Sequence, residues 1–187
     1  KIIQQKKLII ENLEIKKTKV INQQIEPMLE SILLNLDNKN GGYKGAPKFP
    51  TFYLFDTLVY FFNKTKNEKY LTPIEILIKN LCSKGIYDHV EGGIARYTID
   101  ENWMIPHFEK MLYDNVQFIS LVANFLKIKS NEYFIKKVKQ TANFLTNNFI
   151  TKESNLLGSA FDADSEGVEG KYYVYKFEEI KRIKDID

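Results

Sequence analysis

The feature that most constrains this sequence is the alternation of long, strongly apolar helical segments with glycine-bearing loops. The segment 51–62 places large apolar residues on two stripes at helical spacing, so the helix it predicts must be buried on most of its sides. The loops at Gly41, Gly92 and Gly158 lie about fifty to sixty-five residues apart, which is the length of one helical hairpin with an elaborated loop. Because a hairpin cannot cover its own apolar face, we expect several hairpins to stack side by side.

Capping residues and apolar periodicity place the other helices. Helices are predicted over about 27–36, 72–83, 106–127 and 131–149, and a further helix opens at Phe177. The helix at 72–83 is expected to carry Pro73 in its first turn. Two short stretches, 94–99 and 172–175, are predicted strands. We therefore expect an all-α fold with short β segments in the loops, preceded by a linker or helix over residues 1–24.

Composition argues against several classes of partner. The lysines are spread among asparagine and isoleucine at a net charge of +3, without the basic stripe that is typical of nucleic-acid binding. The longest apolar runs are far shorter than the ~20 residues that span a bilayer. Cys82, the only cysteine, lies in an apolar helical segment and is expected to be a buried small hydrophobe, which favours the cytoplasm. We expect no nucleic-acid partner, no membrane partner, no cofactor and no metal.

The two ends of the sequence suggest a larger parent protein. The chain of 187 residues starts at Lys1 without a methionine and ends at Asp187, shortly after a predicted helix start. We therefore expect the remainder of a parent chain to be its main partner.

The segment 87–114 is the richest in polar chemistry, and it holds both histidines and the only tryptophan. His107 is expected to open the helix predicted over 106–127, with Asp114 two turns later on the same face. A carboxylate near a histidine, with Arg96 in reach, could serve acid–base chemistry or hold a hydroxylated ligand. The same residues could instead cap the helix and form structural ion pairs, and the residues alone leave both interpretations open.

Two other loops carry notable polar residues. The run Asp162-Ala163-Asp164-Ser165-Glu166-Gly167 imitates the start of an EF-hand calcium loop, but the twelfth place, which needs a bidentate glutamate, holds Tyr173. A site loop with acidic side chains or a tight acidic turn is therefore favoured. Lys48 lies between two prolines, which would hold it firmly for contact with an anion or a sugar, although a rigid connector explains the same pattern.

Three strings of residues, taken together, resemble one protein family. They are Gly42-Tyr43-Lys44-Gly45-Ala46-Pro47-Lys48-Phe49-Pro50; Gly85-Ile86-Tyr87-Asp88-His89 through Trp103-Met104-Ile105-Pro106-His107-Phe108-Glu109-Lys110-Met111-Leu112-Tyr113-Asp114-Asn115; and Asp162-Ala163-Asp164-Ser165-Glu166-Gly167. In order and spacing they resemble the spermatogenesis-associated protein 20 family, whose bacterial members are called thioredoxin domain-containing proteins, over about residues 25–182.

The resemblance implies a fold and a choice of functions. Family members resemble one another in having a thioredoxin-like domain followed by an (α/α) toroid, similar to that of six-hairpin glycosidases and of N-acylglucosamine 2-epimerase. Residues 25–187 would form an incomplete (α/α)6 toroid, and the thioredoxin-like domain, with its Cys-x-x-Cys, would be missing from this chain. The implied function is to bind or process a carbohydrate-like ligand; the alternative is a non-catalytic binding or regulatory module coupled to the thioredoxin-like domain.

In related toroids the ligand lies in a funnel at the N-terminal ends of the inner helices, so the resemblance implies a glycosidase- or epimerase-like parent. An isolated part with half of that funnel is expected to be inactive.

We expect the polar loops to meet at one pocket mouth, because charged side chains are rarely buried unpaired and the helices are too apolar to host them. The candidate catalytic residues are His107, Asp88 and Asp164. His107 would act as a base, since a helix N-terminus favours its neutral form. The candidate ligand-binding residues are Arg96, Trp103, His89, Glu109, Asp114, Asp162 and Lys48. The alternative is a lattice of ion pairs that staples the loops together.

Overall fold

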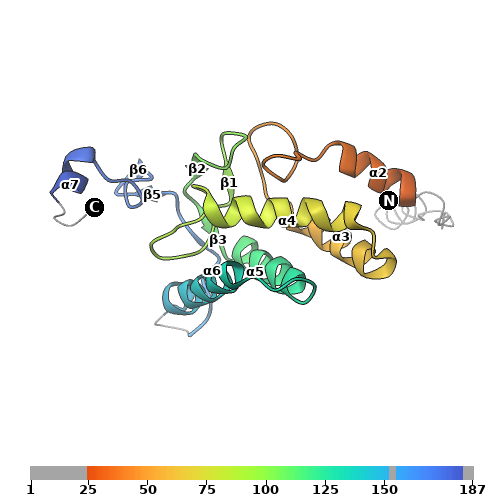
Figure 1. The fold of residues 1–187 in the computed structure, drawn as a ribbon. Coiled ribbons are helices and arrows are strands. Elements are labelled where there is room, and N and C mark those ends of the chain that lie inside the picture. The colour runs from red at the N-terminus through yellow and green to blue at the C-terminus, as the bar shows by residue number, and fades with distance from the viewer. Residues whose placement is uncertain (1–24, 152–154, 183–187) are drawn as a thin grey trace, which may run out of the picture. The chain divides into compact units, whose positions relative to one another are not determined.

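The computed structural model describes residues 25–151 and 155–182, and helices dominate it (Figure 1). Helix α2 (Ile25–Leu34) belongs to one unit, and the described residues from 35 onward belong to a second. The linker or helix expected over residues 1–24 lies outside the described residues. Every strand is two residues long and lies in a loop region. The predicted all-α class with short β segments in its loops is confirmed.

The second unit is built from two helical hairpins. Their helices are α3 (Phe52–Thr65), α4 (Glu68–Ser83), α5 (Leu112–Leu126) and α6 (Glu132–Phe144), and α6 runs on into a π-helix, η2 (Leu145–Phe149). Helix α3 packs on α4 and on α5, and α6 packs on α5 and on α4, so the hairpins stack side by side. Figure 1 shows the short strands within residues 97–111 close together, and those within residues 164–169 farther out, towards the C-terminal end of the coloured ribbon.

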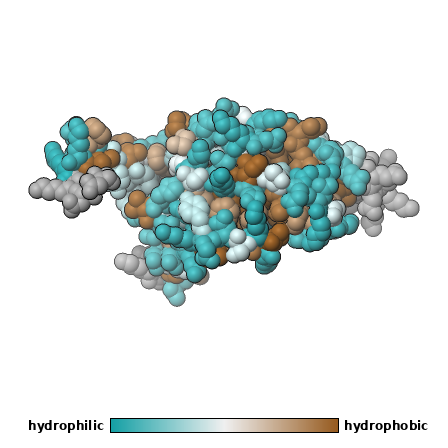
Figure 2. Space-filling view, viewed as in Figure 1, coloured by the Kyte–Doolittle hydropathy of each residue, from teal (hydrophilic) through white to brown (hydrophobic). Residues whose placement is uncertain are grey.

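The core lies between the two hairpins, and on α3 it uses residues of both predicted stripes, whereas on α5 the buried face is centred on Phe118 and Phe125. Phe55, Leu58, Ile74, Phe118 and Phe125 are completely buried there. Each side chain of this size contributes about 1.5–3 kcal/mol when it leaves water. Cys82, on α4, is also fully buried, as expected. The surface seen in Figure 2 is mainly hydrophilic, with hydrophobic residues in separate patches. No described helix has the length and apolar character needed to cross a membrane.

Helix α4 begins earlier than predicted. The side chain of Asn67 accepts a hydrogen bond from the backbone N–H of Lys69 and caps the helix there. The predicted start near Thr72 is therefore wrong, and Pro73 lies inside the helix rather than in its first turn. Since proline has no N–H, the helix lacks one backbone hydrogen bond at that place.

Helix α5 begins at Leu112, so the prediction that His107 opens a helix is wrong. The preceding residues form two strands in two separate pairs: β2 (Pro106–His107) lies antiparallel to β1 (Tyr97–Thr98), and β3 (Lys110–Met111) lies antiparallel to β4 (Ala160–Phe161). The carboxylate of Asp100 accepts the N–H groups of Met104 and Ile105 and fixes the turn that joins β1 to β2. His107 and Asp114 therefore do not share a helical face. The expectation that a helix N-terminus favours the neutral form of His107 is also wrong.

The C-terminal part of the described chain is a loop with one small hairpin, β5 (Asp164–Ser165) with β6 (Val168–Glu169). The strand predicted over 172–175 is wrong, because the N–H groups of Tyr173 and Val174 both donate to the carbonyl of Gly170 and form a turn. Helix α7 (Phe177–Lys181) begins at the predicted residue.

The glycine-bearing loops repeat one hydrogen-bonded geometry. Isolated antiparallel bridges close them at Leu36–Tyr43, Tyr87–Ile94 and Ile150–Leu157. Inside each bridge the same two backbone hydrogen bonds recur. The first residue of the loop donates its N–H to the carbonyl of the sixth: Asp37 to Gly42, Asp88 to Gly93 and Thr151 to Leu156. The fifth residue donates its N–H to the carbonyl of the first: Gly41 to Asp37, Gly92 to Asp88 and Asn155 to Thr151.

The fifth residue of each loop is left-handed, with φ of 74° at Gly41, 98° at Gly92 and 57° at Asn155. Glycine and asparagine adopt that conformation most easily, which explains why the third loop can dispense with a glycine pair.

Candidate functional site

A pocket of about 280 Å³ lies where α3 and α5 begin. We call it the helix-end pocket. Aromatic rings and polar groups share its lining: Phe49, Tyr53 and Tyr113 with Thr51, Arg96, Asp114 and Gln117. The loop before α3 supplies Phe49 and Thr51, and α3 itself supplies Tyr53. The segment before β1 supplies Arg96, and the first turns of α5 supply Tyr113, Asp114 and Gln117.

Asp114 is the most unusual group in the helix-end pocket. Its side chain is only 9 % exposed, and its Oδ2 has no hydrogen-bond partner among the described residues. Burial raises the pKa of Asp114 to about 6, with the positive charge of Arg96 opposing the shift and the negative charge of Glu109 adding to it. A buried carboxyl without a partner is costly, and such groups are frequent in functional sites.

Thr51 is a second unsatisfied group in the same pocket. Its hydroxyl is buried without a partner in the described part of the chain. Its backbone is left-handed, with φ 46° and ψ 49°, at the N-cap of α3. A β-branched residue adopts this conformation only under strain, and strain of this kind gathers at ligand sites.

Arg96 lines the helix-end pocket and is held by two hydrogen bonds to Glu109, in the segment between β2 and β3. Its Nη1 donates to Oε2 of Glu109 at 3.1 Å, and its backbone N–H donates to the carbonyl of Glu109 at 2.9 Å. The hydrogen bond that Arg96 donates to Glu109 raises the pKa of Arg96 further, so the guanidinium stays charged. Because the Arg96 side chain is 40 % exposed, the pair adds little stability but leaves N–H groups for a ligand.

Three stacked aromatic rings lead from the helix-end pocket toward the β5–β6 hairpin, which we call the acidic hairpin. The ring centroids of Phe49 and Tyr97 are 4.6 Å apart, and those of Tyr97 and His107 are 4.8 Å apart. Nδ1 of His107 lies 2.8 Å from Oε1 of Glu169, the strand partner of Asp164. His107 and Asp164 therefore lie at the same end of the helices.

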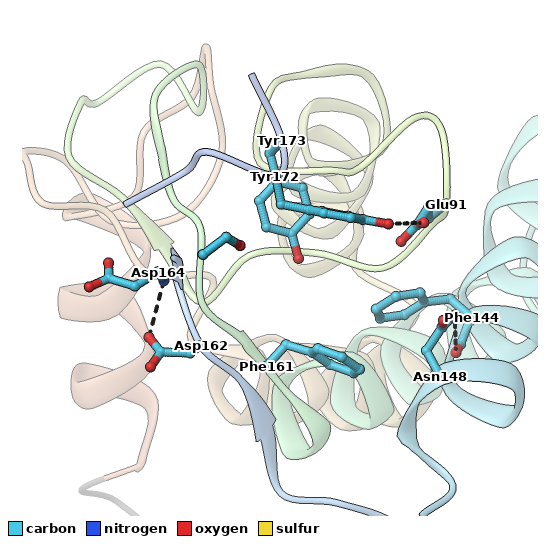
Figure 3. Close-up of a pocket in the computed structure, with 9 residues that line it drawn as sticks. Glu91, Phe144, Asn148, Phe161, Asp162, Asp164, Tyr172 and Tyr173 are labelled. Carbon is cyan, nitrogen blue, oxygen red and sulfur yellow. Dashed lines mark hydrogen bonds between the residues drawn. The ribbon is translucent and has the colours of Figure 1, made fainter. Parts of the chain in front are cut away.

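A second pocket, of about 400 Å³, lies beside the acidic hairpin, and we call it the acidic–aromatic pocket (Figure 3). Its lining includes Asp162 and Asp164, together with Glu91 and the rings of Phe144, Phe161, Tyr172 and Tyr173. The hydroxyl of Tyr172 donates to Glu91 at 2.6 Å, and the N–H of Asp164 donates to Asp162 at 3.2 Å.

Four of the sequence-predicted residues are engaged in contacts with other parts of the chain. Asp88 pairs with the buried ammonium of Lys110 at 2.7 Å, and Lys48, only 1 % exposed, pairs with Asp37 at 2.7 Å. Trp103 is fully buried, and its indole N–H donates to the carbonyl of Asn40.

His89 completes this group. Its Nε2 contacts the Lys84 carbonyl at 3.0 Å, and its Nδ1 contacts the ammonium of Lys137 at 3.1 Å. These contacts fit the structural alternative for all four residues.

The other predicted site residues fall into three groups. Arg96 and Asp114 line the helix-end pocket, with Glu109 paired to Arg96 beside it, and Asp162 and Asp164 line the acidic–aromatic pocket. His107 contacts Glu169 of the β5–β6 hairpin. Within the described ranges no three His, Cys, Asp or Glu side chains are placed to hold a metal ion.

Sequence reasoning missed Thr51 and Gln117. The position of Thr51 at the predicted start of a helix was a usable signal, whereas Gln117 becomes visible only when the true start of α5 is known.

Comparisons with known proteins place the chain by sequence and by fold. It is 32 % identical to spermatogenesis-associated protein 20 of Mus musculus over 157 residues, 30 % identical to that of Homo sapiens over 157 residues, and 35 % identical to an uncharacterized protein of Caenorhabditis elegans over 163 residues. The matches cover 79–80 % of this chain, and the chain spans only about a fifth of each relative, at 20–22 %. No family model matches.

Solved structures show the same fold at low identity. Cellobiose 2-epimerase from Spirochaeta thermophila matches with a TM-score of 0.64 at 17 % identity, over 78 % of this chain and 42 % of that protein. A glycoside hydrolase of family 105 from C. acetobutylicum matches with a TM-score of 0.55 at 17 % identity, over 80 % and 42 %. The described hairpins are therefore part of an (α/α) toroid. By sequence, the chain is similar to spermatogenesis-associated protein 20 over a segment that spans about a fifth of those relatives.

Proposed function

We propose that the helix-end pocket binds a carbohydrate-like, polyhydroxylated small molecule. The observation that carries the proposal is the pair of buried oxygens without partners, Oδ2 of Asp114 and the hydroxyl of Thr51, in one pocket. Hydroxyl groups of a ligand can donate to the carboxyl of Asp114 and can donate to or accept from the hydroxyl of Thr51. Ligand binding would then satisfy groups that are costly to leave unmatched.

The rest of the pocket suits the same ligand. The rings of Phe49, Tyr53 and Tyr113 are partly exposed, and aromatic faces of this kind pack against the apolar C–H faces of a sugar. The N–H groups of Arg96 and the amide of Gln117 add hydrogen-bond donors at its edge. The structural neighbours are sugar epimerases and a glycoside hydrolase, and they support the ligand class by analogy of fold.

Processing of the ligand is the stronger form of this proposal, and His107 is its candidate base. A carboxylate on Nδ1, here from Glu169, holds a histidine in the tautomer that leaves Nε2 as an acceptor. Asp164, on the strand next to Glu169, would be the second carboxylate near the reacting group. Asp88 would act through the loop it holds with Lys110 rather than on the ligand.

The second candidate is a binding or regulatory module without turnover, coupled in a parent protein to a thioredoxin-like domain. Its support is that Asp88, Lys48 and Trp103 are all engaged in structural contacts. The buried thiol of Cys82 agrees with the cytoplasmic location proposed for either candidate.

The test is a panel of mono- and disaccharides, measured on the full chain by thermal melting and by titration calorimetry. We expect a bound sugar to raise the melting temperature, and Asp114→Asn to weaken its binding by about tenfold or more, which is 1.4 kcal/mol. The matched control is Glu75→Gln, a carboxylate paired with Lys129 on the surface, which should leave binding unchanged.

A panel with no melting shift and no heat of binding would refute the proposal. In the full-length parent protein, sugar binding without turnover would favour the second candidate over a processing site, and His107→Gln in that protein separates the two further. If His107 is catalytic, the substitution should abolish turnover and keep the folding stability. If His107 only holds the loops together through its contacts, the substitution should lower the folding stability.

A further inference from the structure

We propose that the acidic–aromatic pocket binds a small organic cation, a substituted amine, through its aromatic rings and carboxylates. The acidic–aromatic pocket and the helix-end pocket share no lining residue, although Asp164 of this pocket is also the second carboxylate in the processing form of the proposal above. Its volume of about 400 Å³ is in the range of small-molecule sites.

The first support is the aromatic part of the lining. Figure 3 shows Tyr172 and Tyr173 on one side of the pocket and Phe144 and Phe161 on the other. The centroids of Tyr172 and Tyr173 are 5.1 Å apart at 85°, and those of Phe144 and Phe161 are 6.0 Å apart. Because the rings meet at steep or tilted angles, they form a partial cage rather than one flat stack, and cages of aromatic rings attract alkylated ammonium groups.

The second support is the charge around that cage. Glu91, Asp162 and Asp164 are the charged members of the lining, and none of its nine residues carries a basic side chain. Burial, with the negative charges of Asp88 and Glu91, raises the pKa of the Tyr173 hydroxyl to about 12. Burial disfavours a charge of either sign at this ring, but the negative charges of Asp88 and Glu91, which add to the shift, favour a positive charge beside it.

The third support comes from Lys110, whose ammonium already uses two of the same rings from inside the protein. Its Nζ lies 4.2 Å from the ring centroid of Phe144 and 4.9 Å from that of Tyr173. Asp88, at 2.7 Å, balances the charge of Lys110, so Glu91, Asp162 and Asp164 remain as net negative charge on the pocket side. Since these rings hold one cation in the folded protein, their geometry is suited to cation–π contact.

The test compares a cation with its neutral copy. Choline and 3,3-dimethyl-1-butanol have nearly the same shape, and only choline is charged. By titration calorimetry on the full chain we expect choline to bind with a millimolar Kd and the alcohol to bind at least about tenfold more weakly. The binding of choline should also weaken as sodium chloride is added, because the carboxylates are exposed.

Variants locate the site. The double variant D162N/D164N keeps the shape and the hydrogen bond from the Asp164 N–H, and we expect it to weaken choline binding about tenfold with an unchanged melting temperature. Tyr172→Leu should weaken binding in the same way, whereas Tyr172→Phe keeps the ring and should retain it. The matched control Glu132→Gln, at the start of α6, should have no effect.

Equal binding of choline and its neutral copy, or binding that D162N/D164N leaves unchanged, would overturn the proposal, as would the absence of choline binding. Asp114→Asn distinguishes this outcome from a failure of the sugar proposal, because it should alter sugar binding and leave choline binding intact.

Discussion

At the scale of single residues, Asp114 shows how a sequence can name a functional residue for the wrong reason. The sequence placed Asp114 beside His107 on one helical face, but His107 lies in a strand. The unmatched Oδ2 of Asp114 and its pocket come instead from the packing of α5 against α3, which no local pattern records. The strained backbone of Thr51 is equally invisible in the sequence, because threonine is an ordinary N-cap residue.

The raised pKa of Asp114 makes a stability prediction with a definite sign. The folded protein holds the proton up to a pH of about 6, whereas an unfolded aspartate loses it near 3.8. Stability contributed by the proton is therefore fully present below pH 3.8 and is lost as the pH rises through 6, by up to about 3 kcal/mol. We expect Asp114→Asn to be more stable than the natural protein at pH 7.5 and to lose that advantage at pH 4. Urea unfolding at the two pH values measures it, and an equal effect at both would contradict the assigned pKa.

At the scale of elements, the sequence predicted the helices where the apolar period is long and failed where non-local pairing decides. The residues Phe108, Met111 and Leu112 fit a helical stripe as well as they fit two strands. What selects the strands is the pairing of His107 with Tyr97 and of Lys110 with Phe161, which is fifty-one positions away. The glycine spacing, by contrast, marks a repeated loop that is closed by hydrogen bonds of its own backbone. A local signal was therefore sufficient to predict the position of these loops.

Two glycines with the same φ angle are predicted to lose different amounts of folding stability when they are replaced by alanine. Gly92 and Gly45 both have φ of 98°, but a Cβ on Gly92 would lie 2.8 Å from the carbonyl oxygen of Gln140, whereas a Cβ on Gly45 would meet nothing within 4 Å. We expect Gly45→Ala to cost about 1–2 kcal/mol through left-handed strain alone, and Gly92→Ala to cost about 1–3 kcal/mol more through the clash. Chemical denaturation of both variants checks the difference, and equal losses would show that the loop and α6 are not packed as described.

At the scale of the molecule, the two stacked hairpins account for a fold shared with sugar epimerases at an identity of only 17 %. Apolar stripes and loop closures tolerate most substitutions, so the fold persists while the pockets at the helix ends change. The sequence could therefore predict the toroid, through its periodicity and its family resemblance, but it could not predict that the polar loops form two pockets. That division depends on where β2 and the β5–β6 hairpin lie, and both are set by contacts between distant segments.

The last prediction concerns whether the two hairpins form one cooperative unit. Phe118 of α5 packs edge-on against Phe52 of α3, with ring centroids 6.3 Å apart, and its centroid lies 6.0 Å from that of Tyr87 in the loop after α4. Because Phe118 is fully buried between the hairpins, Phe118→Ala should cost about 3–5 kcal/mol. If the hairpins share one core, the loss should appear in a single transition.

Two probes on different hairpins make that test decisive. Trp103, the only tryptophan, is buried against the loop before α3 and reports the first hairpin by fluorescence, and the amide signals of α6 report the second by NMR. We expect both probes to shift to the same lower urea midpoint in Phe118→Ala, whereas the exposed substitution Tyr60→Ala on α3 should move neither midpoint appreciably. Midpoints that separate in the variant would mean that each hairpin is stable by itself, and the shared core between α3 and α5 would then not be what holds the helix-end pocket together.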